Sequence, residues 1–245
     1  MELLSTRPAA VAGMFYPGDA RTLAGEVDAL LATAQANRAV SPALTFEQPK
    51  ALIAPHAGYI YSGPIAASAY ALLAPYAQTI RRVVLLGPCH RVAVRGLAVP
   101  HARAFATPLG EIPLDQDAIA TAQKLPQVIR HDAAHAEEHS LEVQLPFLQE
   151  VLDDFTLVPF AVGYATADEV AEVLDLMWGG PETLIVISSD LSHYHPYADA
   201  QRRDRHTTDE IAHLRLLVDH EQACGATPIN GLIELAQRRG LQPHL

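Results

Sequence analysis

The stretch that decides the fold is Ala51-Leu-Ile-Ala-Pro-His-Ala-Gly-Tyr-Ile-Tyr-Ser-Gly63. Its first four residues form a short apolar run, which predicts a strand buried on both faces. Pro55 ends that run, and His56 follows in a turn that contains glycine. Pro64 then predicts the first position of a helix running to about Leu73. A histidine therefore lies between a buried strand and a helix, at the edge of the sheet where ligands bind in open α/β folds.

Two later segments repeat this layout. Residues 82–86, Arg-Val-Val-Leu-Leu, predict a second buried strand that Gly87-Pro88 ends, and His90 follows. Residues 183–188, Thr-Leu-Ile-Val-Ile-Ser, predict a third, and His193 follows. Because the carboxyl ends of parallel strands meet at one edge of a sheet, we expect the three histidines to converge on a common site.

Strand and helix patterns alternate through the rest of the chain. The further predicted elements are a loop over 37–50, a strand over 155–162, a helix from the Thr166/Glu169 capping box, a helix over 199–218 and a helix from Pro228 to Gly240. This order predicts an α/β fold in which a central, mostly parallel sheet has helices on both faces. We expect residues 1–245 to form a single domain.

Charge, hydropathy and cysteine content indicate which binding partners and which cellular compartment to expect. The formal net charge of -11 comes without a Lys/Arg cluster, which disfavours nucleic acid or an anionic membrane surface as a partner. No apolar run approaches the ~20 residues that span a bilayer, and the N-terminus lacks the features of a signal peptide, so we expect a cytoplasmic protein. In such a reducing compartment Cys89 and Cys224 indicate metal ligands, redox groups or core thiols rather than a disulfide.

The segment 131–149 holds a second pair of histidines. His135 and His139 are four residues apart, so one helix would present both on the same face. This is not a zincin motif, because Ala136 stands where that motif needs a glutamate. The pattern favours a helix with Glu137, Glu138 and Glu142 in solvent and Leu141, Val143 and Leu145 packed. We keep only His139 as a candidate site residue.

Several motifs taken together identify a family resemblance. They are Pro8-Ala-Ala-Val-Ala-Gly-Met-Phe-Tyr-Pro17, Pro55-His-Ala-Gly-Tyr-Ile-Tyr-Ser-Gly63, Leu86-Gly-Pro-Cys-His90, Glu138-His-Ser-Leu-Glu-Val-Gln-Leu-Pro146 and Ser188-Ser-Asp-Leu-Ser-His193. In this order, and over most of the chain, they resemble the Memo-like proteins, whose bacterial and archaeal members are also called AmmeMemoRadiSam system protein B. That family is similar in fold to the class III extradiol ring-cleaving dioxygenases.

The resemblance implies a site for one metal ion at the strand ends. His56 and His90 correspond to the two histidine ligands of the dioxygenases, and Cys224 stands where those enzymes place a carboxylate. His193 corresponds to a histidine positioned for acid/base work. Asp190 and His139 line the same pocket. A thiolate makes the site softer than two histidines and a carboxylate, so iron(II), copper and zinc all stay open as the bound metal.

The chain departs from the family pattern in two places. Cys89 stands where the family usually has serine, and it offers either a second thiol or a replacement of similar size. The resemblance also implies further residues beyond the last predicted helix, whereas this sequence ends at Leu245, so we expect either a fragment or a member whose C-terminal end is shortened.

Three functions agree with these observations. The first is an iron or copper redox enzyme with a dioxygenase-like pocket, in which His193 moves protons. The second is a zinc-dependent hydrolase of a small polar substrate, with His193 or His139 as base. The third is a non-catalytic module that binds a peptide or small ligand in the retained pocket. The name of the AmmeMemoRadiSam system also suggests a radical-SAM protein as partner.

Overall fold

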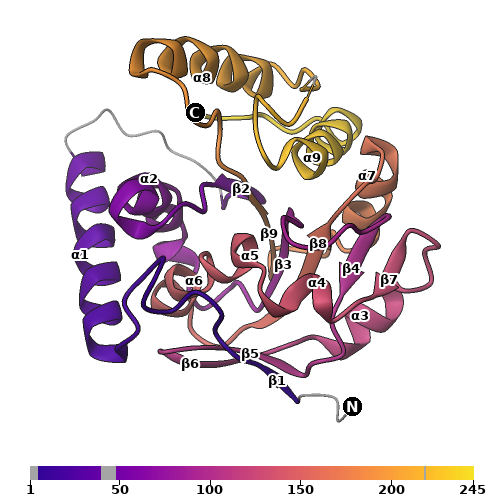
Figure 1. Cartoon of the computed structure of the whole chain (residues 1–245), viewed down its shortest axis with the longest axis horizontal. Helices are drawn as coiled ribbons and strands as arrows, with labels where there is room; N and C mark the ends of the chain where they lie inside the picture. The colour runs from indigo at the N-terminus through magenta and orange to yellow at the C-terminus, as the bar shows by residue number, and fades with distance from the viewer. Residues whose placement is uncertain (1–4, 40–47, 218) are drawn as a thin grey trace.

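A six-stranded, mostly parallel sheet forms the centre of the protein (Figure 1), in a computed structural model that describes residues 5–39, 48–217 and 219–245. In spatial order the strands are β2 (Ala51–Ala54), β9 (Thr183–Ser188), β3 (Arg82–Pro88), β8 (Thr156–Val162), β4 (Leu97–Val99) and β7 (Val128–Arg130). All neighbours pair in parallel except β4 and β8. This is the α/β class that the strand and helix patterns predict.

The three strands that precede the histidine motifs are neighbours in this sheet. β9 lies between β2 and β3, with Ala54 opposite Ser188 and Leu86 opposite Ile187. The side chains of β9 are buried along its whole length, as its apolar run predicts. The carboxyl ends of the three strands therefore reach the same edge of the sheet.

The strand β3 continues two residues beyond its predicted end at Leu86. Gly87 and Pro88 pair with Ala161 and Val162 of β8. The backbone N–H of Cys89 donates to the carbonyl of Val162 in β8. Successive N–H groups of a strand point to opposite sides, so in this part of β3 the odd-numbered residues direct their N–H groups at β8. The N–H that Pro88 lacks would face β9, whose pairing with β3 has already ended at Leu86. The proline therefore removes no hydrogen bond from the sheet.

A second, smaller sheet was not predicted. It contains β1 (Thr6–Arg7), β5 (Ala104–Thr107) and β6 (Gly110–Pro113) in the order β1-β5-β6. β1 is two residues long and pairs with a strand about a hundred residues further along the chain. A segment of that length carries no readable alternation of side chains, so only the folded chain reveals it.

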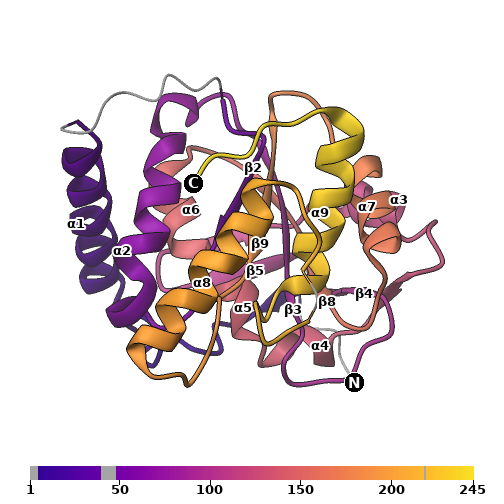
Figure 2. The same ribbon diagram turned by 90° about the horizontal axis from the view of Figure 1, so that it is seen from above.

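Helices cover both faces of the central sheet (Figure 2). The α-helices are α1 (Ala20–Ala39), α2 (Tyr59–Tyr70), α3 (Gln116–Ala122), α4 (Ala133–Ala136), α5 (His139–Glu142), α6 (Leu145–Val151), α7 (Ala167–Leu176), α8 (Tyr197–Ala212) and α9 (Ala226–Arg239), and the 3-10 helix η1 spans Ala71–Tyr76. α1, α2 and α6 lie on one side of the sheet, and α7 and α9 lie together on the other. Among the described residues, no helix combines the length and apolar character needed to cross a lipid bilayer.

Several predicted helix boundaries were wrong; α9, for example, begins at Ala226 and not at Pro228. α2 begins at Tyr59, and Pro64 lies inside it rather than at its first position. The backbone N–H of Tyr59 donates to the carbonyl of Phe15, so a contact with the N-terminal segment starts the helix five residues early. In the predicted loop over 37–50, the first residues belong to α1, while 40–47 fall outside the described residues. The helix predicted to reach Val218, which is also not described, ends at Ala212.

Candidate metal centre

Two histidines and an aspartate lie at the carboxyl edge of the central sheet, each two residues beyond its strand. His56 follows β2, His90 follows β3 and Asp190 follows β9. Cys224, in the turn before α9, joins them from the far end of the sequence. The strand order β2-β9-β3 is what brings residues so distant in sequence to one place.

His56, His90 and Cys224 bring three donor atoms close together, and we call these three residues the cluster, or the donor set. One nitrogen of each imidazole and the Cys224 Sγ all lie within 4.8 Å of one another. Cys224 Sγ lies 3.3 Å from His56 Nε2. The side chain of His56 is 2% exposed and that of His90 is 31% exposed, so the set is closed on one side and reached by solvent on the other.

Glu138 orients His90 through both carboxylate oxygens. Oε1 lies 2.9 Å from His90 Nδ1 and also accepts from the backbone N–H of Ser140, while Oε2 accepts from the backbone N–H of His90. Burial opposes ionisation of Glu138, but these hydrogen bonds outweigh it and lower its pKa to about 2. An ionised carboxylate only accepts, so His90 Nδ1 carries a proton and Nε2 faces the cluster.

The cluster favours the thiolate form of Cys224. Burial raises the pKa of the thiol, but hydrogen bonds with His56 and His90 more than compensate and lower it to about 6. Burial likewise lowers the pKa of His90, whereas hydrogen bonds with Cys224 and Glu138 raise it to about 9. Cys89 differs, because it donates to the carbonyl of Val92 and burial raises the pKa of its thiol. Of the two cysteines, Cys224 is thus the one prepared to bind a metal ion.

His139 lies against the cluster. Its ring centroid is 4.8 Å from that of His90, 5.4 Å from that of His56 and 4.7 Å from that of Phe15. Burial lowers the pKa of His139 to about 4, so it is neutral at pH 7. Its Nδ1 makes no hydrogen bond and lies 3.4 Å from Glu138 Oε1. His139, His90 and Glu138 thus form a second set of closely spaced donor atoms beside the first.

Asp190 and His193 lie on the more open side. Asp190 Oδ1 accepts from the backbone N–H groups of His56 and Ala57, while Oδ2 is 3.9 Å from His56 Nε2 and 3.8 Å from His193 Nε2. The side chain of His193 is 43% exposed. His193 therefore lies at the solvent-exposed rim of the site and contacts Asp190. It does not converge with His56 and His90 on the donor set, although the strand pattern had predicted this.

The prediction of one helix across 131–149 was wrong. The segment forms α4, α5 and α6, and His135 points away from His139, with its Nε2 2.9 Å from the carbonyl oxygen of Ala98. Glu137 is exposed and the three apolar residues are buried, as predicted, but Glu138 and Glu142 are buried rather than solvated. Helical periodicity places such glutamates outside, and no local signal reveals the tertiary donors that hold them inside. Glu138 is the site residue that sequence reasoning missed.

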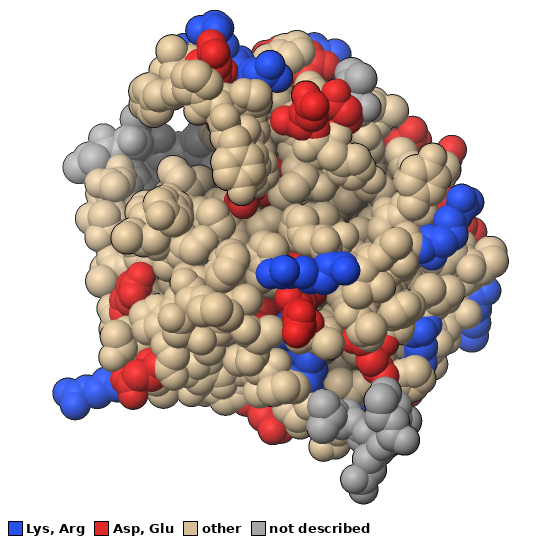
Figure 3. All heavy atoms as spheres, viewed as in Figure 1, with Lys and Arg blue, Asp and Glu red and all other residues tan. Residues whose placement is uncertain are grey.

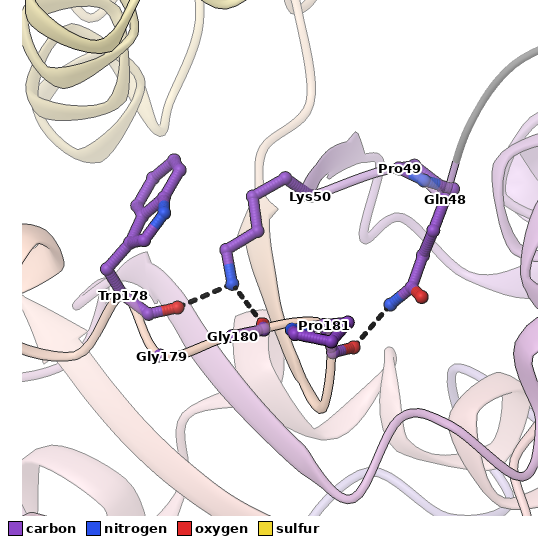
Figure 4. A pocket seen from close by; sticks show the side chains of 7 residues that line it. All are labelled: Gln48, Pro49, Lys50, Trp178, Gly179, Gly180 and Pro181. Atoms are coloured by element: carbon purple, nitrogen blue, oxygen red, sulfur yellow. Dashed lines mark hydrogen bonds between the residues drawn. The ribbon is translucent and has the colours of Figure 1, made fainter.

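A separate hollow lies at the opposite, amino-terminal edge of the sheet (Figure 4). Its lining residues are Gln48, Pro49, Lys50, Trp178, Gly179, Gly180 and Pro181, which directly precede β2 and β9. Lys50 Nζ donates to the backbone carbonyls of Trp178, Gly180 and Thr183, and it stands over the ring of Trp178. With its ammonium fully engaged, this lysine ties two strand starts together and leaves no free cation for a ligand.

Acidic and basic side chains are interspersed on the face seen in Figure 3, and other residues make up most of that face. The formal net charge of -11 is therefore not gathered into one acidic patch on this side of the molecule.

The donor set of the cluster suits a transition-metal ion. Two imidazoles and a thiolate are ligands for iron, copper and zinc. Glu138 and Ser188 each contact the Nδ1 atom of one imidazole, which is how metal-binding histidines are usually held. The residues present therefore fit a metal ion without any rearrangement of the elements that carry them.

Comparison with known proteins connects this site to a family. The family model described as Memo-like protein matches residues 7–241. A MEMO1 family protein of Sulfolobus acidocaldarius is 34% identical over 96% of this chain and 89% of its own length. One from Aquifex aeolicus is 34% identical over 97% and 88%, and one from Methanopyrus kandleri is 37% identical over 85% and 76%.

Proposed function

The chain belongs to the Memo-like family, and from this premise we propose that it binds one redox-active metal ion, iron(II) or copper, through His56, His90 and Cys224 to oxidise a small-molecule substrate. The α/β architecture agrees with the dioxygenase-like fold of that family. When bound, such an ion would supply electron transfer at the carboxyl edge of the sheet.

One observation carries this proposal, namely the convergence of the two imidazoles and the thiolate-favouring Cys224 within 4.8 Å. A thiolate and two anchored imidazoles form a softer set than two histidines and a carboxylate, and such a set binds copper(I) and iron as well as zinc. The partial exposure of His90 gives a substrate one side from which to approach.

The neighbouring side chains would bind and move protons. His139 is neutral at pH 7 and its ring lies against those of His56 and His90, so its imidazole can exchange a proton with a substrate in the pocket. His193 lies between solvent and Asp190, where it can pass a proton across the rim. Asp190 also fixes the loop after β2 through the backbone N–H groups of His56 and Ala57.

The test is an anaerobic titration of metal-free protein with iron(II), copper(I) and zinc. We expect one equivalent to bind tightly, with iron(II) or copper(I) preferred, and the loss of that binding in His56→Ala and in Cys224→Ser. Cys89→Ser is the matched control, because its thiol contacts the carbonyl of Val92 and lies outside the donor set, and it should bind as the wild type does. Binding that survives both ligand substitutions would contradict the proposal.

Neutral His139 beside the cluster also favours a second candidate, a zinc-dependent hydrolase with His139 as general base. A preference for zinc, together with hydrolysis that consumes no oxygen, would select this function over the redox one. A non-catalytic binding module would instead fold without metal, and His56→Ala would leave its stability unchanged.

A further inference from the structure

A chain of buried hydrogen bonds runs behind the metal centre and ends on His56. Tyr70 OH donates to Gln144 Oε1 at 2.7 Å, Gln144 Nε2 lies 2.8 Å from Ser188 Oγ, and Ser188 Oγ lies 2.8 Å from His56 Nδ1. All four residues are at most 1% exposed. Buried polar groups satisfy their hydrogen bonds with the partners around them, so these partners determine where each proton of the hydrogen-bonded series lies.

The side-chain amide of Gln144 has one orientation that satisfies its surroundings. Its Nε2 lies 2.9 Å from the carbonyl oxygen of Pro55 and 3.4 Å from that of Ala54. Carbonyl oxygens only accept, so this end of the amide is the NH₂ group. One N–H serves the Pro55 carbonyl, and the other is directed at Ser188 Oγ.

The hydroxyl of Ser188 has a single proton and three neighbours. The carbonyl oxygen of Ser140, at 2.6 Å, can only accept, so it takes that proton. Gln144 Nε2 can only donate to the hydroxyl oxygen. The remaining lone pair of Ser188 Oγ faces His56 Nδ1, and two lone pairs facing each other would repel. A bond between these atoms therefore requires a proton on His56 Nδ1.

We propose that Ser188 and Gln144 are positioning residues that keep a proton on His56 Nδ1 and so leave Nε2 as the nitrogen available at the cluster. The geometry agrees with this assignment, because His56 Nε2 is the atom that lies 3.3 Å from Cys224 Sγ. The proton assignment stands on the hydrogen-bond chain alone. Its consequence for metal affinity rests on the proposed function.

Nitrogen NMR of the metal-free protein tests the assignment directly. With ¹⁵N-labelled histidine, and with the signals of His56 identified by their loss in His56→Asn, we expect Nδ1 to resonate as a protonated nitrogen at pH 7 and at pH 8.5. A His56 Nδ1 that resonates as an unprotonated nitrogen would overturn the proposal. This spectrum needs the wild-type fold only, so it decides the question even if a substitution at Ser188 prevents folding.

Ser188→Ala tests the positioning role. Without the hydroxyl acceptor, we expect His56 to move toward the form with its proton on Nε2 and metal affinity to fall roughly 10- to 100-fold. Ser62→Ala is the matched control, since it also removes a buried hydroxyl near His56, but one that donates to the carbonyl of Ala57. It should leave both the nitrogen signals and the affinity unchanged. Equal nitrogen signals in Ser188→Ala and wild type would overturn the role of Ser188.

The two proposals fail in distinguishable ways. A protonated Nδ1 in a protein that binds no metal would uphold the hydrogen-bond assignment and reject the proposed function. Tight metal binding, together with a proton on His56 Nε2 in the metal-free protein, would uphold the proposed function and reject the hydrogen-bond assignment.

Discussion

At the scale of single residues, Glu142 has four hydrogen-bonding partners, all in the N-terminal segment. Its side chain is fully buried, pairs with Arg7, and accepts from the backbone N–H groups of Ala10 and Val11 and from Tyr16 OH. Breaking a buried ion pair leaves an uncompensated charge and costs about 3–5 kcal/mol. Urea denaturation should show a loss of this size in Glu142→Gln, because Arg7 then stays buried without its partner charge.

Glu137→Gln is the control for that prediction, since Glu137 lies in the same segment but is exposed. Its free energy of unfolding should match that of the wild type. If the two glutamine variants were equally stable, the buried pair between Glu142 and Arg7 would not have the importance that the structure gives it.

His135 makes the stability of the fold depend on pH. Burial is the main reason that its pKa falls to about 4, and Arg7 lowers it further, while the Ala98 carbonyl, Asp132 and Glu138 act in the opposite direction. In the unfolded chain this group titrates near pH 6.5. Between pH 6.5 and 4 the unfolded chain binds more protons than the folded one, so the free energy of unfolding falls as the pH falls.

The expected size is about 2 kcal/mol between pH 7 and pH 5, from at most ~1.4 kcal/mol for each pH unit below the unfolded pKa. In His135→Gln the amide can still donate to the Ala98 carbonyl but does not titrate, so denaturation curves at the two pH values should differ by that much less. An unchanged pH dependence in the variant would show that His135 is not the group responsible.

Site residues could be predicted from the sequence where the signal lies in the neighbouring residues. His56 and His90 could be picked out because each follows a readable strand, while Cys224 came from family resemblance and not from spacing. Glu138 could not be found from periodicity, because its burial depends on donors that belong to His90 and Ser140. The hydrogen bond of Ser188 to His56 joins residues 132 positions apart and has no local signature.

At the scale of elements, Lys50 clamps the starts of β2 and β9 (Figure 4). Its ammonium donates to three backbone carbonyls of the segment 178–183. A hydrogen bond to a charged group contributes about 1.5–3 kcal/mol, but Lys50 is only half-buried, and solvent screening reduces the sum of the three. Lys50→Met keeps the apolar stem but removes the donors, and should lower the free energy of unfolding by about 2 kcal/mol. Lys124→Met, at an exposed position, is the control and should change it little.

Metal affinity should be the same in Lys50→Met as in the wild type, because the clamp and the donor set lie at opposite edges of the sheet. A variant that lost stability and affinity together would contradict this separation.

Among the elements, strands were easier to predict than helices. The buried strands carry continuous apolar runs, and four of them lie where these runs are. The segment 131–149 was misread because α4, α5 and α6 are too short to show a helical period, and contacts with distant residues decide where each one ends. Gly87 shows the same dependence, since a Cβ there would lie 2.8 Å from Ser140 Oγ in α5.

At the scale of the whole molecule, the candidate site lies at one edge of the central sheet and the contacts of Lys50 lie at the other. The carboxyl edge gathers His56, His90 and Cys224, while the amino edge is tied by Lys50. The alternation of strands and helices was sufficient to predict this layered fold and the edge that carries the site. It could not predict the small sheet of β1, β5 and β6, whose first strand is set by a partner far away in sequence.

X-ray absorption spectroscopy of the iron- or copper-loaded protein tests the central claim most directly, because it reports the atoms bound to the metal. We expect one sulfur and two imidazole nitrogens, with the sulfur contribution lost in Cys224→Ser and kept in Cys89→Ser. A bound metal without sulfur in the wild type, or with sulfur still present in Cys224→Ser, would contradict the assignment of His56, His90 and Cys224 as its ligands.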